Sequence, residues 1–126
     1  MKTILYNKNV NAIGVDNALP VTFGRDANAF DSTVYSNDAS TARQVVAATS
    51  GSSIYITDVV ISTDKAMSLK LQDSDGTAVM ERVYLAANST VSKTFATPLE
   101  VTEDKALNML ASVDGNVTVT VSGYTN

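Results

Sequence analysis

The sequence consists largely of short apolar segments that alternate with polar residues, with turn residues recurring about every 8–12 positions. The clearest segment is 117–122, in which each valine is followed by threonine or serine. Successive side chains on a strand point to opposite faces, so this alternation predicts a strand with one buried face. No segment has a helical apolar period of useful length, and we therefore expect an all-β fold.

The same reading predicts about eight strands, in 42–49, 53–62, 67–72, 77–85, 90–95, 99–102, 107–112 and 117–122. The run 53–62 is apolar on both faces for much of its length, which is typical of a central strand. Asp73-Ser74-Asp75-Gly76 and Asp114-Gly115 are hairpin signals, and Thr97-Pro98 is expected to interrupt a strand. This spacing indicates an antiparallel sandwich or barrel, and eight strands with hairpins favour a jelly roll over an immunoglobulin-type sandwich.

The first 40 residues differ from the rest of the chain because they lack sustained periodicity and are rich in Asn, Asp, Ala and Ser. We predict two parts: an extended N-terminal arm with short strands over residues 1–40, and a jelly-roll domain over 41–126. The alternative is that the first 40 residues form edge strands and loops of the same domain. An arm with scattered apolar residues needs another surface to bury them, such as a neighbouring subunit.

The composition excludes most enzyme chemistry. The chain has no Cys and no His, which removes a Cys nucleophile, a Ser-His-Asp triad and the usual zinc ligands. Nine Lys and Arg against 13 Asp and Glu leave a net charge of −4, which argues against nucleic-acid binding. We therefore expect a protein that is not an enzyme, with no catalytic residues, no cofactor, no metal and no nucleic-acid partner.

Two features of the chain bear on targeting. The apolar run at the N-terminus stops after Tyr6, whereas a secretory signal needs about 7–15 apolar residues. The longest apolar stretches elsewhere are far shorter than the roughly 18 residues of a membrane span. We expect a chain made in a cytoplasm, with no membrane partner.

Several acidic residues are candidate sites. Asp73, Asp75 and Gly76 match the first part of a calcium loop, but the strand expected after them favours a hairpin turn. Asp58 lies in the most apolar strand, where an unpaired charge is costly. It has no partner at a fixed spacing, so a position near a sheet edge or in a subunit contact is favoured over catalysis.

Other side chains are candidates for contact surfaces. Glu81 and Arg82 are expected to face solvent or a partner subunit. The five tyrosines are dispersed and there is no Trp, so a sugar-stacking surface is the less favoured interpretation.

Five phrases of residues 42–126 carry a resemblance to a known group of proteins. They are Tyr55-Ile56-Thr57-Asp58-Val59-Val60-Ile61-Ser62, Asp73-Ser74-Asp75-Gly76-Thr77, Ala96-Thr97-Pro98-Leu99-Glu100-Val101, Ala106-Leu107-Asn108 and Val119-Thr120-Val121-Ser122-Gly123-Tyr124. Together they resemble the small jelly-roll structural proteins of tailed bacteriophages, of the head decoration (cement) type. The phrases are strand and turn patterns rather than chemical signatures, and no motif of the first 40 residues takes part.

The resemblance implies a structural virion protein on the outer surface of a capsid. Such a protein is expected to be a homotrimer that binds the major capsid protein and stabilises contacts between capsid subunits. The residues expected to dock on the capsid or on a sister subunit are Ile4, Leu5, Tyr6, Val10 and Ile13. The alternative is a phage tail or fibre component that recognises a glycan of the host surface.

Overall fold

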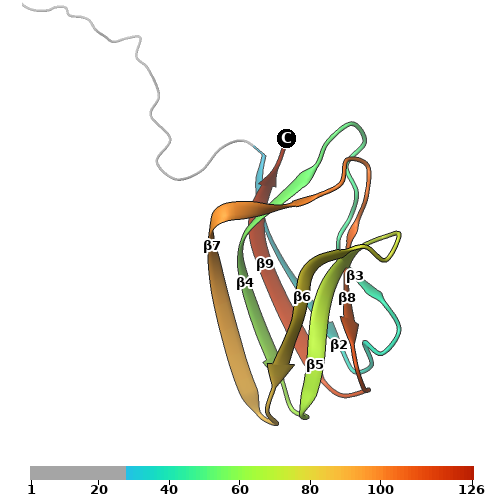
Figure 1. The fold of residues 1–126 in the computed structure, drawn as a ribbon, viewed down its shortest axis with the longest axis vertical. Helices are drawn as coiled ribbons and strands as arrows, with labels where there is room; N and C mark the ends of the chain where they lie inside the picture. Colours follow the sequence, from blue (N-terminus) through green and yellow to red (C-terminus); the bar gives the residue numbers. More distant parts are fainter. Residues whose placement is uncertain (1–27) are drawn as a thin grey trace, which may run out of the picture.

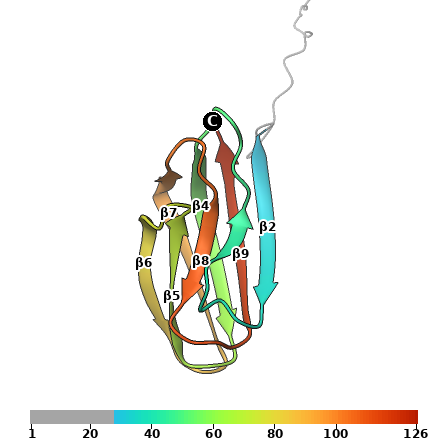
Figure 2. The same ribbon diagram turned by 90° about the vertical axis from the view of Figure 1, so that its right-hand side faces the viewer.

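Eight strands form two four-stranded antiparallel sheets in the computed structural model, which describes residues 28–126. The strands are β2 (Ala29–Ser36), β3 (Arg43–Val46), β4 (Ile54–Thr63), β5 (Met67–Asp73), β6 (Ala78–Leu85), β7 (Ser89–Val101), β8 (Leu107–Ala111) and β9 (Val117–Thr125). The sheets pack face to face (Figures 1 and 2). The described residues contain no helix, which confirms the all-β prediction.

The order of the strands identifies the sandwich as a jelly roll. One sheet has the order β2-β9-β4-β7 and the other β3-β8-β5-β6. Only β5 and β6 are both consecutive and paired, whereas every other connection between described strands crosses from one sheet to the other. The predicted eight-stranded jelly-roll sandwich is therefore confirmed.

The core lies between the sheets, and most of it comes from the inward-facing alternate residues of the four inner strands. From the first sheet these are Ile54, Ile56, Val59, Ile61, Val117, Val119 and Val121, and from the second Met67, Leu69, Leu71, Leu107, Met109 and Ala111. Strand β4 lies between β9 and β7, so the prediction that 53–62 is a central strand is confirmed. Its outer face holds half-buried Tyr55 and exposed Val60, which explains its apolar appearance on both faces.

The predicted break at Thr97-Pro98 is wrong as a strand boundary but marks a real irregularity. Strand β7 runs through it, and its register with β4 shifts between the pairs Ile56–Leu99 and Asp58–Thr94. Proline lacks an N–H to donate, and an edge strand tolerates it at such a bulge. The two strands expected in 90–102 are thus one.

The eighth strand comes from the segment for which short strands were expected. Strand β2 pairs with β9 over its whole length, from Ala29–Tyr124 to Ser36–Val117. The first sheet therefore begins before residue 41. The arm itself remains a prediction, because residues 1–27, including Ile4, Leu5, Tyr6, Val10 and Ile13, lie outside the described residues.

The two hairpin signals have different outcomes. Asp73–Gly76 joins the paired strands β5 and β6, with Gly76 at a φ of 92°, so the first hairpin is confirmed. Asp114-Gly115 also turns the chain, but it joins β8 in one sheet to β9 in the other, so the second hairpin is wrong. Turn residues specify a reversal of the chain, whereas burial of the inner face decides which strands pair.

Gly123 occupies the point where β9 comes closest to the irregular part of β4. The register between these strands shifts between Ile56–Gly123 and Asp58–Ser122, which leaves Thr57 as the extra residue. A Cβ atom on Gly123 would collide with the Tyr55 carbonyl oxygen. A glycine is therefore required here for the close approach of two backbones.

We expect Gly123→Ala to lower the free energy of unfolding by about 3 kcal/mol, because the added methyl group must displace backbone of the central strand. Chemical denaturation measures this. Gly51→Asn is the control, since Gly51 has open space around it and a φ of 76° that Asn tolerates. An equal loss of unfolding free energy in the two variants would contradict the role of close packing at Gly123.

Candidate functional site

The outer face of the β2-β9-β4-β7 sheet carries an array of hydroxyl groups. Because Val117, Val119 and Val121 face the core, the residues between them face outward, and so do their partners on neighbouring strands. This hydroxyl face consists of Thr33, Thr118, Thr120, Ser122, Ser62, Thr90, Ser92 and Thr94. The face can form many hydrogen bonds, and the carboxylates of Asp31 and Asp58 give it negative charge.

Neighbouring hydroxyls on this face bond to one another across the strands. The Oγ1 atoms of Thr33 and Thr120 are 3.0 Å apart, and Ser62 Oγ lies 2.9 Å from Thr90 Oγ1. Each hydroxyl can both donate and accept, so these pairs retain further hydrogen-bonding capacity toward a ligand or water.

Two carboxylates and two hydroxyls line an open hollow of about 280 Å³ on this face, beside the bulge of β4. Asp58 accepts hydrogen bonds from Thr94 Oγ1 at 2.8 Å and from Thr57 Oγ1 at 3.0 Å. Asp31 accepts one from Ser122 Oγ at 2.7 Å. Asp58 thus lies on the outward face with hydroxyl partners, which explains how a charge fits in an apolar strand.

Tyr55 and Tyr124 stack beside this hollow. They are a directly paired couple of β4 and β9, with ring centroids 5.1 Å apart and planes inclined by 14°. Partial burial raises the pKa of Tyr55 above its ordinary 10.0, and the nearby Glu100 carboxylate raises it further. The pair presents an aromatic surface next to carboxylates and hydroxyls, a combination suited to a polyhydroxylated ligand.

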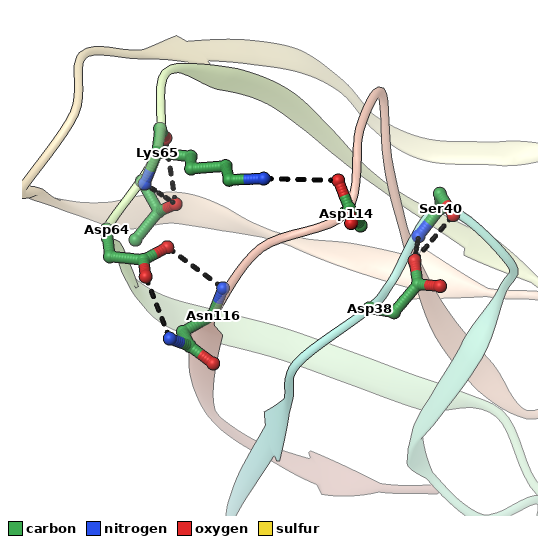
Figure 3. Close-up of polar contacts among 7 residues, drawn as sticks. Asp38, Ser40, Asp64, Lys65, Asp114 and Asn116 are labelled. Carbon is green, nitrogen blue, oxygen red and sulfur yellow. Dashed lines mark hydrogen bonds and ion pairs between the residues drawn. The ribbon is translucent and has the colours of Figure 1, made fainter.

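A second polar cluster closes one end of the sandwich, where the β4–β5 turn meets the β8–β9 loop (Figure 3). Asp64 accepts hydrogen bonds from the backbone N–H of Asn116 at 2.9 Å and from its side-chain Nδ2 at 2.8 Å. The amide oxygen of Asn116 accepts one from the Tyr35 hydroxyl at 2.6 Å. These bonds tie together three segments from β2, β4 and β9, so the cluster has a structural role.

Two simpler interactions flank that cluster. Lys65 Nζ lies 3.2 Å from Asp114 Oδ1, with both side chains more than half exposed. Asp38 accepts hydrogen bonds from the hydroxyl and backbone N–H of Ser40, and these lower the pKa of its carboxyl below the ordinary value. Both interactions stabilise loops, and neither indicates a catalytic role.

The remaining residues weighed from the sequence lie on turns and on the opposite sheet. Asp73 Oδ1 accepts bonds from the N–H groups of Asp75 and Thr77, at 2.8 and 3.0 Å, as in an ordinary polar turn. Glu81 and Arg82 are exposed, and Arg82 donates to Ser68 Oγ at 3.0 Å. Residues 28–126 hold no group of three or more acidic side chains arranged for a metal ion.

Only the tertiary structure brings the two stacked tyrosines together. They are far apart in the chain, and the sequence pattern indicates dispersed tyrosines. The pairing of β4 with β9 places the two tyrosines side by side, and no local sequence motif predicts that pairing. Within the described part of the chain, no helix has the length and apolarity of a membrane span.

Comparison with known proteins gives similarity in structure only. No protein-family model and no curated protein matches the chain. Two solved structures with similarity are the coat protein of Tobacco streak virus and the virus-like particle of Macrobrachium rosenbergii extra small virus. The first is 12% identical, covers 82% of this chain and 90% of its own, and has a TM-score of 0.42. The second is 12% identical, covers 98% of this chain and 95% of its own, and has a TM-score of 0.39. With values this low, the fold assignment rests on the strand order described above.

We expect Asp64→Ala to destabilise the protein by about 1–2 kcal/mol, because it removes two hydrogen bonds to Asn116. Asp114→Ala is the matched control at the same end of the sandwich. It removes only an exposed ion pair and is expected to change stability by less than about 1 kcal/mol. Thermal denaturation of both variants checks this, and a larger loss for Asp114→Ala would contradict it.

The raised pKa of Tyr55 predicts a dependence of stability on alkaline pH. The folded state favours the neutral phenol, so the contribution of Tyr55 is present below pH 10 and is lost as the pH rises through its folded pKa. We expect Glu100→Gln to bring this pKa part of the way back, because partial burial remains. NMR titration of the Tyr55 ring measures it, and Glu81→Gln on the other sheet should leave it unchanged.

Proposed function

We propose that this protein is a structural component of a virion, a bacteriophage capsid decoration (cement) protein. It binds the outer shell and stabilises contacts between major capsid subunits. Its partners are the major capsid protein and further copies of itself in a homotrimer, and the work it does is mechanical rather than catalytic. It is made in the host cytoplasm and resides on the capsid surface.

One observation carries this proposal. The phrases that resemble decoration proteins cover most of the central strand β4, the β5–β6 turn and parts of β7, β8 and β9, all within a sandwich of jelly-roll order. The residues that carry the resemblance thus lie in strands of both sheets and in the turn that joins β5 to β6. A fold alone does not specify a function, so the proposal depends on the binding experiments below.

The arm is the proposed docking element. Ile4, Leu5, Tyr6, Val10 and Ile13 are apolar residues outside the periodic part of the chain and would bury surface only on contact with a partner. We expect deletion of residues 2–15 to abolish binding to decoration-free capsid shells while circular dichroism still shows a folded β protein. Cosedimentation with the shells measures the loss.

A substitution pair provides a control for that deletion. Replacement of the five apolar residues by Ser should have the same effect as the deletion, whereas replacement of Asn7, Lys8 and Asn9 by Ser should leave binding intact. Undiminished binding of the deleted chain would contradict the role of the arm.

Light scattering coupled to size exclusion tests the homotrimer. We expect a mass near three times the 13.3 kDa of the chain. A trimer would bury apolar surface beyond the small core of one sandwich. A monomer would shift the favoured role to the tail or fibre.

The second candidate is a tail or fibre component that recognises a glycan of the host surface. The hollow with Asp31 and Asp58 beside the Tyr55–Tyr124 pair favours it, because carboxylates bind sugar hydroxyls and tyrosine rings pack on sugar faces. A glycan array would show specific binding that Tyr124→Ala and Asp58→Asn abolish. Tyr84→Ala, on the other sheet and 80% exposed, is the control. Binding that survives all three changes would overturn this role.

A further inference from the structure

Strand β2 lies at the edge of its sheet, and the side of β2 away from β9 is open to another strand. We propose that this edge binds residues 4–6 of a neighbouring copy as an added strand, and that the exchange of these segments holds the trimer together. The inference rests on the proposed homotrimer and names the surface that accepts the arm.

The hydrogen bonds between β2 and β9 identify which backbone groups face outward. The N–H of Thr125 donates to the carbonyl of Asn28 at 3.2 Å, in register with the pairing of the two strands. In an antiparallel ladder such bonded residues alternate with residues whose amides face the other way. The amide and carbonyl groups of Thr33 and Tyr35 therefore point away from β9, and no strand within residues 28–126 lies on that side.

The other three edges of the sandwich have features that discourage strand addition. Strand β7 has Pro98, a shifted register and Lys93, which pairs with the buried Val59 and so lies on the inward side. Strand β6 has two register shifts and the exposed charges of Glu81 and Arg82, and β3 has four residues, including exposed Arg43, and one shift. Charge, proline and bulges are the usual protection of edge strands.

Strand β2 has neither a proline nor a bulge, and its one charged residue, Asp31, accepts a hydrogen bond from Ser122 Oγ of β9. Its eight residues keep an uninterrupted register with β9 and include no proline, lysine or arginine. A long, regular edge of this kind is a template for another strand. The edge is therefore suited to pairing through the backbone, with side chains adding specificity.

A hollow next to this edge provides room for the side chains of an added strand. It has a volume of about 440 Å³, lies between β2 and β3, and is lined by Val34, Tyr35, Ser36, Asn37, Arg43 and Gln44. Tyr35 is 61% exposed there. With a period of two, Ile4 and Tyr6 of an added strand share one face, so both can enter the hollow while Leu5 faces the opposite way.

The length of the N-terminal segment favours a neighbouring copy as the donor. Twenty-two positions separate Tyr6 from Asn28, which extend to roughly 70 Å, whereas the eight residues of β2 span roughly 26 Å. The segment can therefore reach well beyond its own sandwich. Donor and acceptor are different surfaces, and such head-to-tail contacts form a closed ring when three rotations complete the circle, as in a trimer.

A proline substitution in β2 tests the acceptor. Thr33→Pro removes an outward N–H and leaves the β2–β9 ladder intact, so we expect the trimer to dissociate into folded monomers. Thr33→Val, which replaces only the hydroxyl by a methyl group and keeps the N–H, should stay trimeric. Ser92→Pro should also stay trimeric, because the alternation across β9 and β4 turns the Ser92 amide outward on the opposite edge.

Mixing two defective chains separates the donor from the acceptor. The donor variant Ile4→Asp/Tyr6→Asp keeps an intact β2 edge, and Thr33→Pro keeps an intact arm, so each alone is expected to be monomeric. Their mixture retains one working contact and should form a 1:1 heterodimer by light scattering. A donor variant that stays trimeric, or a mixture that stays monomeric, would overturn the exchange.

Disulfide trapping keeps the proposal testable if Thr33→Pro does not fold. The chain has no cysteine, so Thr33→Cys combined in turn with Ile4→Cys, Leu5→Cys or Tyr6→Cys gives unambiguous cross-links. Covalent dimers and trimers on a non-reducing gel support the exchange, whereas monomers closed internally, or no cross-link in any pair, overturn it. These readouts do not involve the shell, so their failure is distinguishable from a failure to bind capsid.

Discussion

The structure depends on the apolar contact between its two sheets. The chain has no cysteine and its described residues form no helix, so the extensive burial within residues 28–126 is between the inner faces of the sandwich. Ile56, Ile61, Leu69 and Leu71 are completely buried there, and each such side chain contributes about 1.5–3 kcal/mol. Because every inner strand must keep its apolar residues on this side, the registers of β4 and β9 follow from the same contact.

With one face of each sheet committed to the core, partners and ligands have the outer faces and the edges. The first sheet presents serine and threonine hydroxyls outward, and the stacked Tyr55 and Tyr124 lie beside carboxylates at the bulge of β4. Its edge β2 is long and regular, whereas β7 carries Pro98 and Lys93. The two proposed uses of the molecule, assembly and glycan binding, therefore involve different parts of one sheet.

Much of the fold could be predicted because alternation is a local signal. The alternation of Val117, Val119 and Val121 predicts their strand directly, and the long apolar run at 53–62 indicates a strand in the centre of a sheet. Which strands pair with one another was harder to predict from the sequence. Asp114-Gly115 indicates a turn but not that β8 and β9 belong to different sheets, and Pro98 indicates a break where an edge strand continues through a bulge. The number of strands still agrees with the expected eight, because two expected strands are the single strand β7 and β2 is an additional strand.

The sequence by itself determined the strand-rich class, the inward-facing residues and the lack of histidine and cysteine chemistry, since each depends on residue type and on a period of two. Tertiary structure alone decided which strands are neighbours, because hydrogen bonds between strands join residues of any separation in the chain. Tyr55 therefore meets Tyr124 and Asp58 meets Thr94 only in the folded sheet. The open edge of β2 likewise exists only because β9 occupies its other side.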